Sequence, residues 1–243
     1  LYEQEVRLIP YLVSTLFDED ASLREEALSL LVQLGEAYLL FPAHEKDYKE
    51  KMEYGFHDER ARDANLWLPL PHPFTAGRPP FGARERVRQH FRALIYPIVA
   101  ELESWTAKER LQSARLLEML LLFAEGHATE FAHQILPAIA KASDPENPEL
   151  AALVAAAASV FAQHVTPDHY MPVALSRVRV DALNALSQRV QYLHLMVPLM
   201  RGMRPHTLAE ALPQMLPDLL ERDTVTAQGT AMRRAVSSLL RAL

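Results

Sequence analysis

Proline recurs inside short apolar segments of this chain, at a spacing that few folds produce. Five segments have this form, and each contributes one proline: Pro10, Pro97, Pro137, Pro172 and Pro213. The last four prolines are spaced by 40, 35 and 41 residues, whereas the first gap is 87 residues. Self-similarity with a period of this length is typical of proteins built from stacked helical repeats.

Each proline segment is followed by a turn and a second apolar helical pattern. Ser22 and Glu25 predict a capping box at the start of the first such helix. Asn147 followed by Pro148 predicts the start of a later one, since Asn caps well and Pro suits the first helical position. Gly126 is a plausible helix end. The pattern therefore predicts pairs of helices, with the proline in the first member of each pair.

A proline inside a helix removes one backbone donor and kinks the helix. A kinked first helix, a turn with Asp, and an Arg early in the second helix (Arg24, Arg110) match the HEAT repeat. Because one such hairpin cannot bury its apolar stripe alone, neighbouring hairpins must stack. We therefore predict an all-α fold, an α-solenoid of about five HEAT-type helical hairpins; an irregular helical bundle is the alternative.

The expected organisation is a single solenoid fragment over residues 1–243, since the chain begins without Met and ends in a helical pattern. A fragment cut at both ends would leave apolar surface incompletely covered near Leu8, Leu12, Leu239 and Leu240. The predicted repeats span 1–41, 85–126, 127–164, 165–203 and 204–243, with a charged and proline-rich insertion at 42–84.

The insertion contains the stretch NLWLPLPHPFTAGRPPFG, which has five prolines and several aromatic residues. No two of these prolines are three residues apart, so the P-x-x-P core of a conventional SH3 ligand is absent. Large aromatic residues in a loop either pack back on the scaffold or anchor a partner. The candidates for partner contact in this stretch are Trp67, Phe74, Arg78 and Phe81.

Charged residues on the second helices form another candidate set. Arg115 and Glu118 are predicted to line a partner-binding face, and Gln188, Arg189 and Gln191 are predicted to be exposed on the same side of a later repeat. A basic run on a first helix is predicted to be a solvated helix face; it comprises Arg84, Arg86, Arg88 and Arg92.

Composition and motif searches exclude several function classes. The net charge is -6, which argues against nucleic acid as the main partner. There is no cysteine, and the spacing of the histidines does not match a helical metal site. Nucleotide-binding and hydrolase motifs are absent, and no apolar run is long enough to span a membrane. We therefore predict a protein that is not an enzyme, with no metal, no cofactor and no nucleic-acid or membrane partner.

One run of the chain resembles a known family. The run FGARERVRQHFRALIYPIVAELESWTAKERLQSARLLEMLLLFAEGHAT resembles the HEAT-repeat dynein axonemal assembly factor family, through the G-x-R-E helix entry, Trp105 and the Ser113–Ala114 pair. Shorter similarities lie at Lys46–Tyr54, His164–Leu175 and Met200–Leu212. Together these segments cover about half the chain in order, whereas Ser176–Pro198 and the last thirty residues match poorly.

The resemblance implies a cytoplasmic, non-catalytic scaffold that acts in the pre-assembly of axonemal dynein arms for motile cilia or flagella. The implied partners are axonemal dynein chains, intermediate or heavy, and other assembly factors or co-chaperones. The alternative is a generic HEAT-repeat adaptor of the nuclear-transport or phosphatase-scaffold type.

Overall fold

The chain is all-helical in the computed structural model. The structure describes residues 2–53, 69–71, 73–74, 77–143, 147–179, 185–226 and 229–242. Within these ranges there are α-helices, 3-10 helical turns and other turns, and no β-strand. The prediction of an all-α fold is therefore confirmed.

The helices group into two compact units, residues 1–97 with 119–124 and residues 98–118 with 125–243. We call them the N-terminal and the C-terminal unit. The first helices of the hairpins are α1 (Tyr2–Thr15), α5 (Phe81–Glu101), α7 (Ala132–Ala142), α9 (Pro167–Val178) and α11 (Pro205–Leu219). The second helices are α2 (Ala21–Leu39), α6 (Ala107–Ala124), α8 (Pro148–His164), α10 (Leu186–Gly202) and α13 (Thr230–Ala242). Further short helices are α3 (Pro42–Glu53), η2 (Glu125–Phe131) and α12 (Arg222–Val225).

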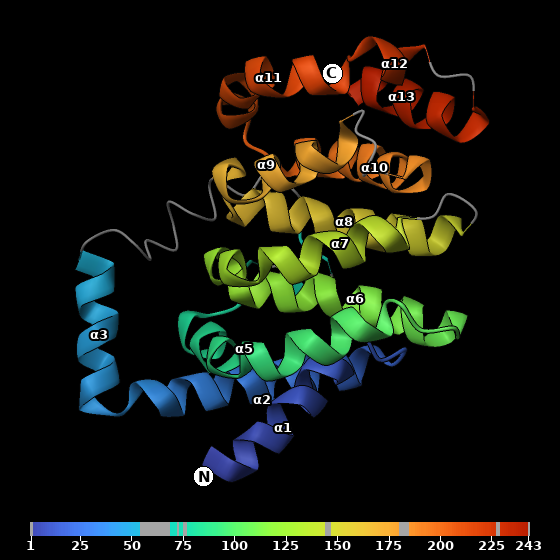
Figure 1. Cartoon of the computed structure of the whole chain (residues 1–243). Coiled ribbons are helices and arrows are strands. Elements are labelled where there is room, and N and C mark those ends of the chain that lie inside the picture. The colour runs from blue at the N-terminus through green and yellow to red at the C-terminus, as the bar shows by residue number, and fades with distance from the viewer. Residues whose placement is uncertain are drawn as a thin grey trace. The chain divides into compact units, whose positions relative to one another are not determined.

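Hairpins stack side by side within the C-terminal unit (Figure 1). The first helix α9 packs on α7 and α11, and the second helix α10 packs on α8 and α13. Each helix pair also contacts internally, as α7 does with α8 and α9 with α10. This two-layer packing buries the apolar stripe of every helix against a neighbouring hairpin, as expected for stacked helical repeats.

The periodic prolines all lie inside first helices. Pro10, Pro97, Pro137, Pro172 and Pro213 fall within α1, α5, α7, α9 and α11 respectively. Each removes a backbone donor from its helix. The prediction that the proline marks the first helix of each hairpin is confirmed, whereas the repeat and insertion boundaries stay predictions.

Helix ends were predicted with mixed success. Asn147 caps α8, accepting a hydrogen bond from the Leu150 amide at 3.1 Å, as predicted. The Ser22 capping box is wrong: the N-cap is Asp20, so α2 begins two residues earlier than predicted, and the Asp20 carboxylate accepts from the Ser22 amide at 2.8 Å. The hydrogen bonds from Ser22 lower the pKa of Asp20, consistent with a charge-assisted cap.

The predicted helix end at Gly126 is one residue off. Helix α6 ends at Ala124, and the following Glu125 has a φ of 51°, in the left-handed region. A left-handed residue commonly ends a helix, and Gly is its usual occupant. Here Glu125 takes that conformation, and its side chain is buried.

The basic run on α5 is not a solvated face. Arg84 and Arg86 are buried and Arg88 is half-buried, so the prediction holds for Arg92 alone. Arg88 donates from Nε to the carbonyls of Phe123 and Ala124, at 3.2 and 3.1 Å. These carbonyls lie in the last turn of α6, where backbone acceptors have no helical partner.

Two further contacts explain the other buried arginines of the run. The Arg86 guanidinium lies over the Tyr38 ring, 5.2 Å from its centroid, and the Arg84 guanidinium lies 6.0 Å from the Phe81 centroid. Such cation–π contacts are worth most when water is excluded. Of these two contacts, the one between Arg86 and Tyr38 joins α5 to α2.

Arg189 is buried, which corrects its prediction as an exposed residue of the second-helix face. Its Nε donates to the Val178 carbonyl at 3.0 Å and its Nη2 donates to the Thr224 hydroxyl at 2.7 Å. The guanidinium thereby ties α10 to the end of α9 and to α12. Alanine at this position would leave buried acceptors without a donor.

We expect Arg189→Ala to lower the free energy of unfolding by about 2–3 kcal/mol, because hydrogen bonds to charged donors are strong and their loss leaves buried groups unsatisfied. Urea titration followed by circular dichroism measures the change. The matched control is Arg233→Ala on exposed α13 surface, which should stay within about 0.5 kcal/mol. Equal effects of the two substitutions would show that the Arg189 hydrogen bonds are not stabilising.

Candidate protein-binding groove

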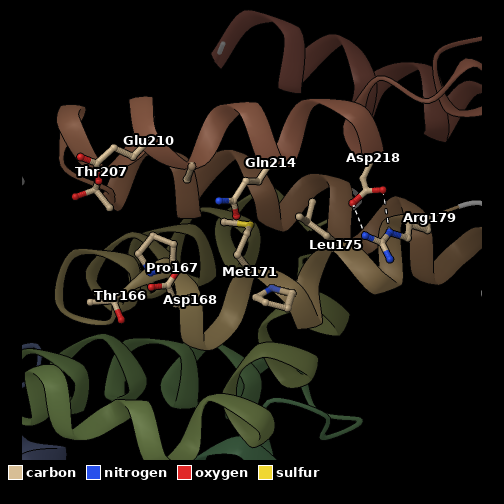
Figure 2. Close-up of a pocket in the computed structure, with 12 residues that line it drawn as sticks. Thr166, Pro167, Asp168, Met171, Leu175, Arg179, Thr207, Glu210, Gln214 and Asp218 are labelled. Atoms are coloured by element: carbon tan, nitrogen blue, oxygen red, sulfur yellow. Dashed lines mark hydrogen bonds and ion pairs between the residues drawn. The ribbon is translucent and has the colours of Figure 1, made fainter.

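A groove of about 630 Å³ lies between α9 and α11 in the C-terminal unit. Both helices contribute one stripe of side chains to it (Figure 2). The α9 stripe comprises Asp168, Met171, Pro172, Leu175 and Arg179, and the α11 stripe comprises Thr207, Glu210, Ala211, Gln214 and Asp218.

The two stripes have the same internal spacing. Residues three, four, seven and eleven positions apart share one face of a helix. Each member of the α9 stripe also has a counterpart in the α11 stripe 39 residues later, as Arg179 has in Asp218. The groove is therefore formed by equivalent faces of two successive repeats. Pro172 and Ala211 both line it and carry short side chains.

The C-terminal end of the groove is closed by an ion pair. Arg179 donates from Nε and Nη2 to the two carboxylate oxygens of Asp218, at 2.8 and 2.9 Å. This two-pronged geometry fixes the orientation of both groups. The hydrogen bonds to Asp218 raise the pKa of Arg179. The one cation among the lining residues is thus matched by a carboxylate.

The other end of the groove is acidic. Asp168 and Glu210 lie there, away from the Arg179–Asp218 pair (Figure 2). Among the residues that the structure describes, neither carboxylate forms an ion pair or side-chain hydrogen bond. Between the two ends, Met171 and Leu175 form an apolar floor and are almost fully buried. The groove therefore offers apolar contact beside uncompensated negative charge.

The predicted contact residues of the proline-rich stretch do not form an exposed cluster. Trp67 lies outside the described residues. Phe74 is 2% exposed and its ring meets the Phe123 ring edge-on, with 5.5 Å between centroids. Phe81 is likewise buried and Arg78 is half-buried. Phe74 and Phe81 are thus packed into the N-terminal unit, and their role in partner binding stays a prediction.

The second-helix candidates lie on α6. Arg115 is half-buried and pairs with Glu149 of α8, with 3.2 Å between nitrogen and oxygen. Glu118 is also half-buried, and desolvation raises the pKa of its carboxyl to about 7. Neither residue lines the groove between α9 and α11. Their role in partner binding stays a prediction.

Glu118 should make stability depend on pH. Its pKa is raised in the folded state, so the charged form is disfavoured there, and stability falls as pH rises from about 4.5 to about 7. We expect Glu118→Gln to be more stable than the parent at pH 8, by about 1–3 kcal/mol, with the difference shrinking toward pH 4.5. Urea unfolding across this range measures it, and the exposed Glu26→Gln is the control. A stability difference between Glu118→Gln and the unsubstituted chain that does not change with pH would contradict the raised pKa of Glu118.

The sequence marks neither the groove nor the exposure of Trp105. No motif marks the groove, and only the 39-residue offset between two matching stripes signals it. Trp105 was noted as part of the family resemblance, and its side chain is 92% exposed in the turn between α5 and α6. Exposure of this kind is not readable from local sequence.

Within the described ranges, no group of three or more His, Asp or Glu side chains is placed to hold a metal ion. No described helix combines the length and the apolar character needed to cross a bilayer.

Comparison with known proteins places the chain beside one family. The family model for the HEAT-repeat domain of dynein axonemal assembly factor 5 matches residues 71–243. The Homo sapiens dynein axonemal assembly factor 5 is 27% identical over 175 residues, which is 71% of this chain and 19% of that protein. The Xenopus laevis protein of the same name is 25% identical over 179 residues, 73% of this chain and 20% of that protein.

The chain thus spans about a fifth of the length of these relatives. A crystal structure of an engineered protein covers 96% of this chain at 13% identity, but its TM-score of 0.31 is too low to carry an argument. The family match confirms the resemblance seen in the sequence, and it confirms the HEAT-type fold predicted from the proline period.

Proposed function

Because the chain belongs to the HEAT-repeat family of dynein axonemal assembly factor 5, we propose that it is a non-catalytic protein-binding scaffold in the pre-assembly of axonemal dynein arms. It acts in the cytoplasm, before the motors reach the cilium or flagellum, and motile cilia depend on it. The observation that carries this proposal is the family match over residues 71–243.

The proposed partners are axonemal dynein chains, intermediate or heavy, together with other assembly factors or co-chaperones. Stacked helical hairpins suit this role because they present long surfaces made of successive repeats. The groove between α9 and α11 supports a binding role, since it is open, partly apolar and lined by two repeats. No cofactor, nucleic acid or membrane is part of the proposed mechanism.

Affinity capture from ciliated cells tests the proposal. The tagged chain is expressed during ciliogenesis, captured, and its bound proteins are identified by mass spectrometry. We expect axonemal dynein chains or assembly co-factors to be enriched over an unrelated helical-repeat protein of similar size. Recovery of nuclear-transport cargo or phosphatase subunits, without any dynein chain or assembly factor, would replace the proposal with the generic adaptor.

A second experiment tests the function in cells. Depletion of the parent protein should leave cilia that are immotile and lack dynein arms, while unassembled dynein chains remain in the cytoplasm. Normal beating with normal arms after complete depletion would exclude a required role. This readout does not depend on which surface of the solenoid binds.

A further inference from the structure

We infer that the groove between α9 and α11 binds an extended segment of a partner protein in which a Lys or Arg and a Leu- or Met-sized residue lie two positions apart. The inference rests on the proposed scaffold role, because it requires that the chain bind proteins. It does not require the partner to be a dynein chain, so the two can fail separately.

The size of the groove fits a short peptide segment. Its volume of about 630 Å³ lies within the range of roughly 300–1,000 Å³ that ligand sites occupy. The stripe from Asp168 to Arg179 rises about 16 Å along the helix axis. An extended segment advances about 3.3 Å per residue, so about five residues fit along it.

The charge at the open end selects a cation. Asp168 and Glu210 add two negative charges that no described side chain neutralises. Asp168 lies in the first turn of α9, where its negative charge interacts favourably with the helix dipole. This interaction leaves the carboxylate oxygens able to accept hydrogen bonds from a ligand. A Lys or Arg placed between the two carboxylates would supply the missing donors.

The apolar middle of the groove selects the second residue. Met171 and Leu175 form the floor, and the short side chains of Pro172 and Ala211 also line the groove. Alternate residues of an extended segment face the same side. A cation at the acidic end therefore places the residue two positions later above Met171, which is a flexible side chain suited to contact with varied apolar groups.

The far end disfavours an acidic ligand. Arg179, the one cation among the lining residues, already gives two hydrogen bonds to Asp218. A phosphate or an acidic peptide would have to displace Asp218 and would meet the carboxylates of Asp168 and Glu210. The groove therefore favours a basic and apolar partner segment over an anionic one.

Selection from a library of short random peptides displayed on phage tests this inference without a known partner. We expect peptides with Lys or Arg two positions from Leu or Met to be enriched on the chain. Enrichment of acidic peptides, or no enrichment over bare resin, would overturn the inference. Binding of the best enriched peptide is then measured by fluorescence anisotropy.

Two variants locate the binding site. Asp168→Asn combined with Glu210→Gln should raise the Kd of the enriched peptide by about five- to tenfold, which is the effect expected from losing two partly exposed charge pairs. Glu19→Gln combined with Glu26→Gln removes two exposed carboxylates elsewhere and should change nothing. If both double variants weaken binding equally, the attraction is non-specific and the groove is not the site.

A volume test complements the charge test. Ala211→Phe fills the groove and should abolish binding, whereas Ala209→Phe places the same ring on the exposed side of α11 and should not. Circular dichroism checks that both variants fold. If Ala211→Phe instead abolishes self-association seen by sedimentation, and no peptide is selected, the occupant is a second copy of the chain and the inference is wrong.

Discussion

Replacing Gly82 by valine should destabilise the N-terminal unit by about 3 kcal/mol or more. The new side chain would clash with backbone atoms, which cannot move aside as a flexible side chain can. Gly82 of α5 and Gly35 of α2 face each other at a helix crossing. A methyl group on Gly82 would overlap the carbonyl of Gly35, and one on Gly35 would overlap the backbone amide of Ala83. The two helices must separate to accept any side chain there.

The helix preference of glycine argues in the opposite direction. Glycine inside a helix is about 1 kcal/mol less favourable than alanine, so Gly82→Ala gains propensity while it loses packing. We expect the overlap to win, with Gly82→Ala less harmful than Gly82→Val. Gly126→Ala is the control, because a methyl group there would meet only an ordinary contact with the His164 carbonyl at 3.8 Å.

Hydrogen exchange distinguishes a local from a global effect. Amides of α2 and of residues 81–97 in α5 should lose protection in Gly82→Val, while the amides of α10 should keep theirs, since these parts of the two crossing helices belong to the N-terminal unit. If Gly82→Val is as stable as Gly126→Ala, the helices approach less closely than the structure has them.

Local sequence physics was sufficient where one segment determines its own structure. Pro137 and Pro172 mark first helices because a proline kink is a property of the chain around it. Asn147 caps α8 because its acceptor and the Leu150 amide are three residues apart. Even here a neighbouring acceptor can intervene, as Asp20 does in place of Ser22 at the start of α2.

Distant partners explain what the sequence did not reveal. The local sequence predicts that Arg88 is exposed, but the guanidinium donates to the carbonyls of Phe123 and Ala124, which lie 35 and 36 residues later in the chain. The local sequence likewise predicts that Arg189 is exposed, but it is buried and donates to the hydroxyl of Thr224, 35 residues later in the chain. A charged side chain on an amphipathic helix therefore cannot be assigned to solvent until the next repeat is placed.

The groove was hidden for the same reason. Its acidic end and its apolar floor come from α9 and α11, and neither stripe alone forms a recognisable motif. The repeat period seen in the prolines predicts that these helices are neighbours. It does not predict how the side chains of the two stripes meet, because that depends on the register between the hairpins.

Phe74, in the proline-rich stretch, is expected to contribute strongly to stability. We expect Phe74→Ala to lower the stability of the N-terminal unit by about 3–5 kcal/mol, the usual loss when a buried phenylalanine is truncated. The ring is 2% exposed and meets Phe123 edge-on at an interplanar angle of 82°. Such ring pairs contribute beyond their buried area. Urea unfolding of the variant measures the loss.

This result decides between the two roles that the sequence left open for Phe74. A structural ring loses stability on truncation, and Phe74→Leu, which keeps most of the volume, should restore much of it. A partner anchor would instead leave stability unchanged and weaken capture of partners. Trp105→Ala is the matched control, because its ring is 92% exposed and its removal should shift stability by no more than about 0.5 kcal/mol. If the two alanine variants prove equally stable, Phe74 does not hold its loop on the N-terminal unit.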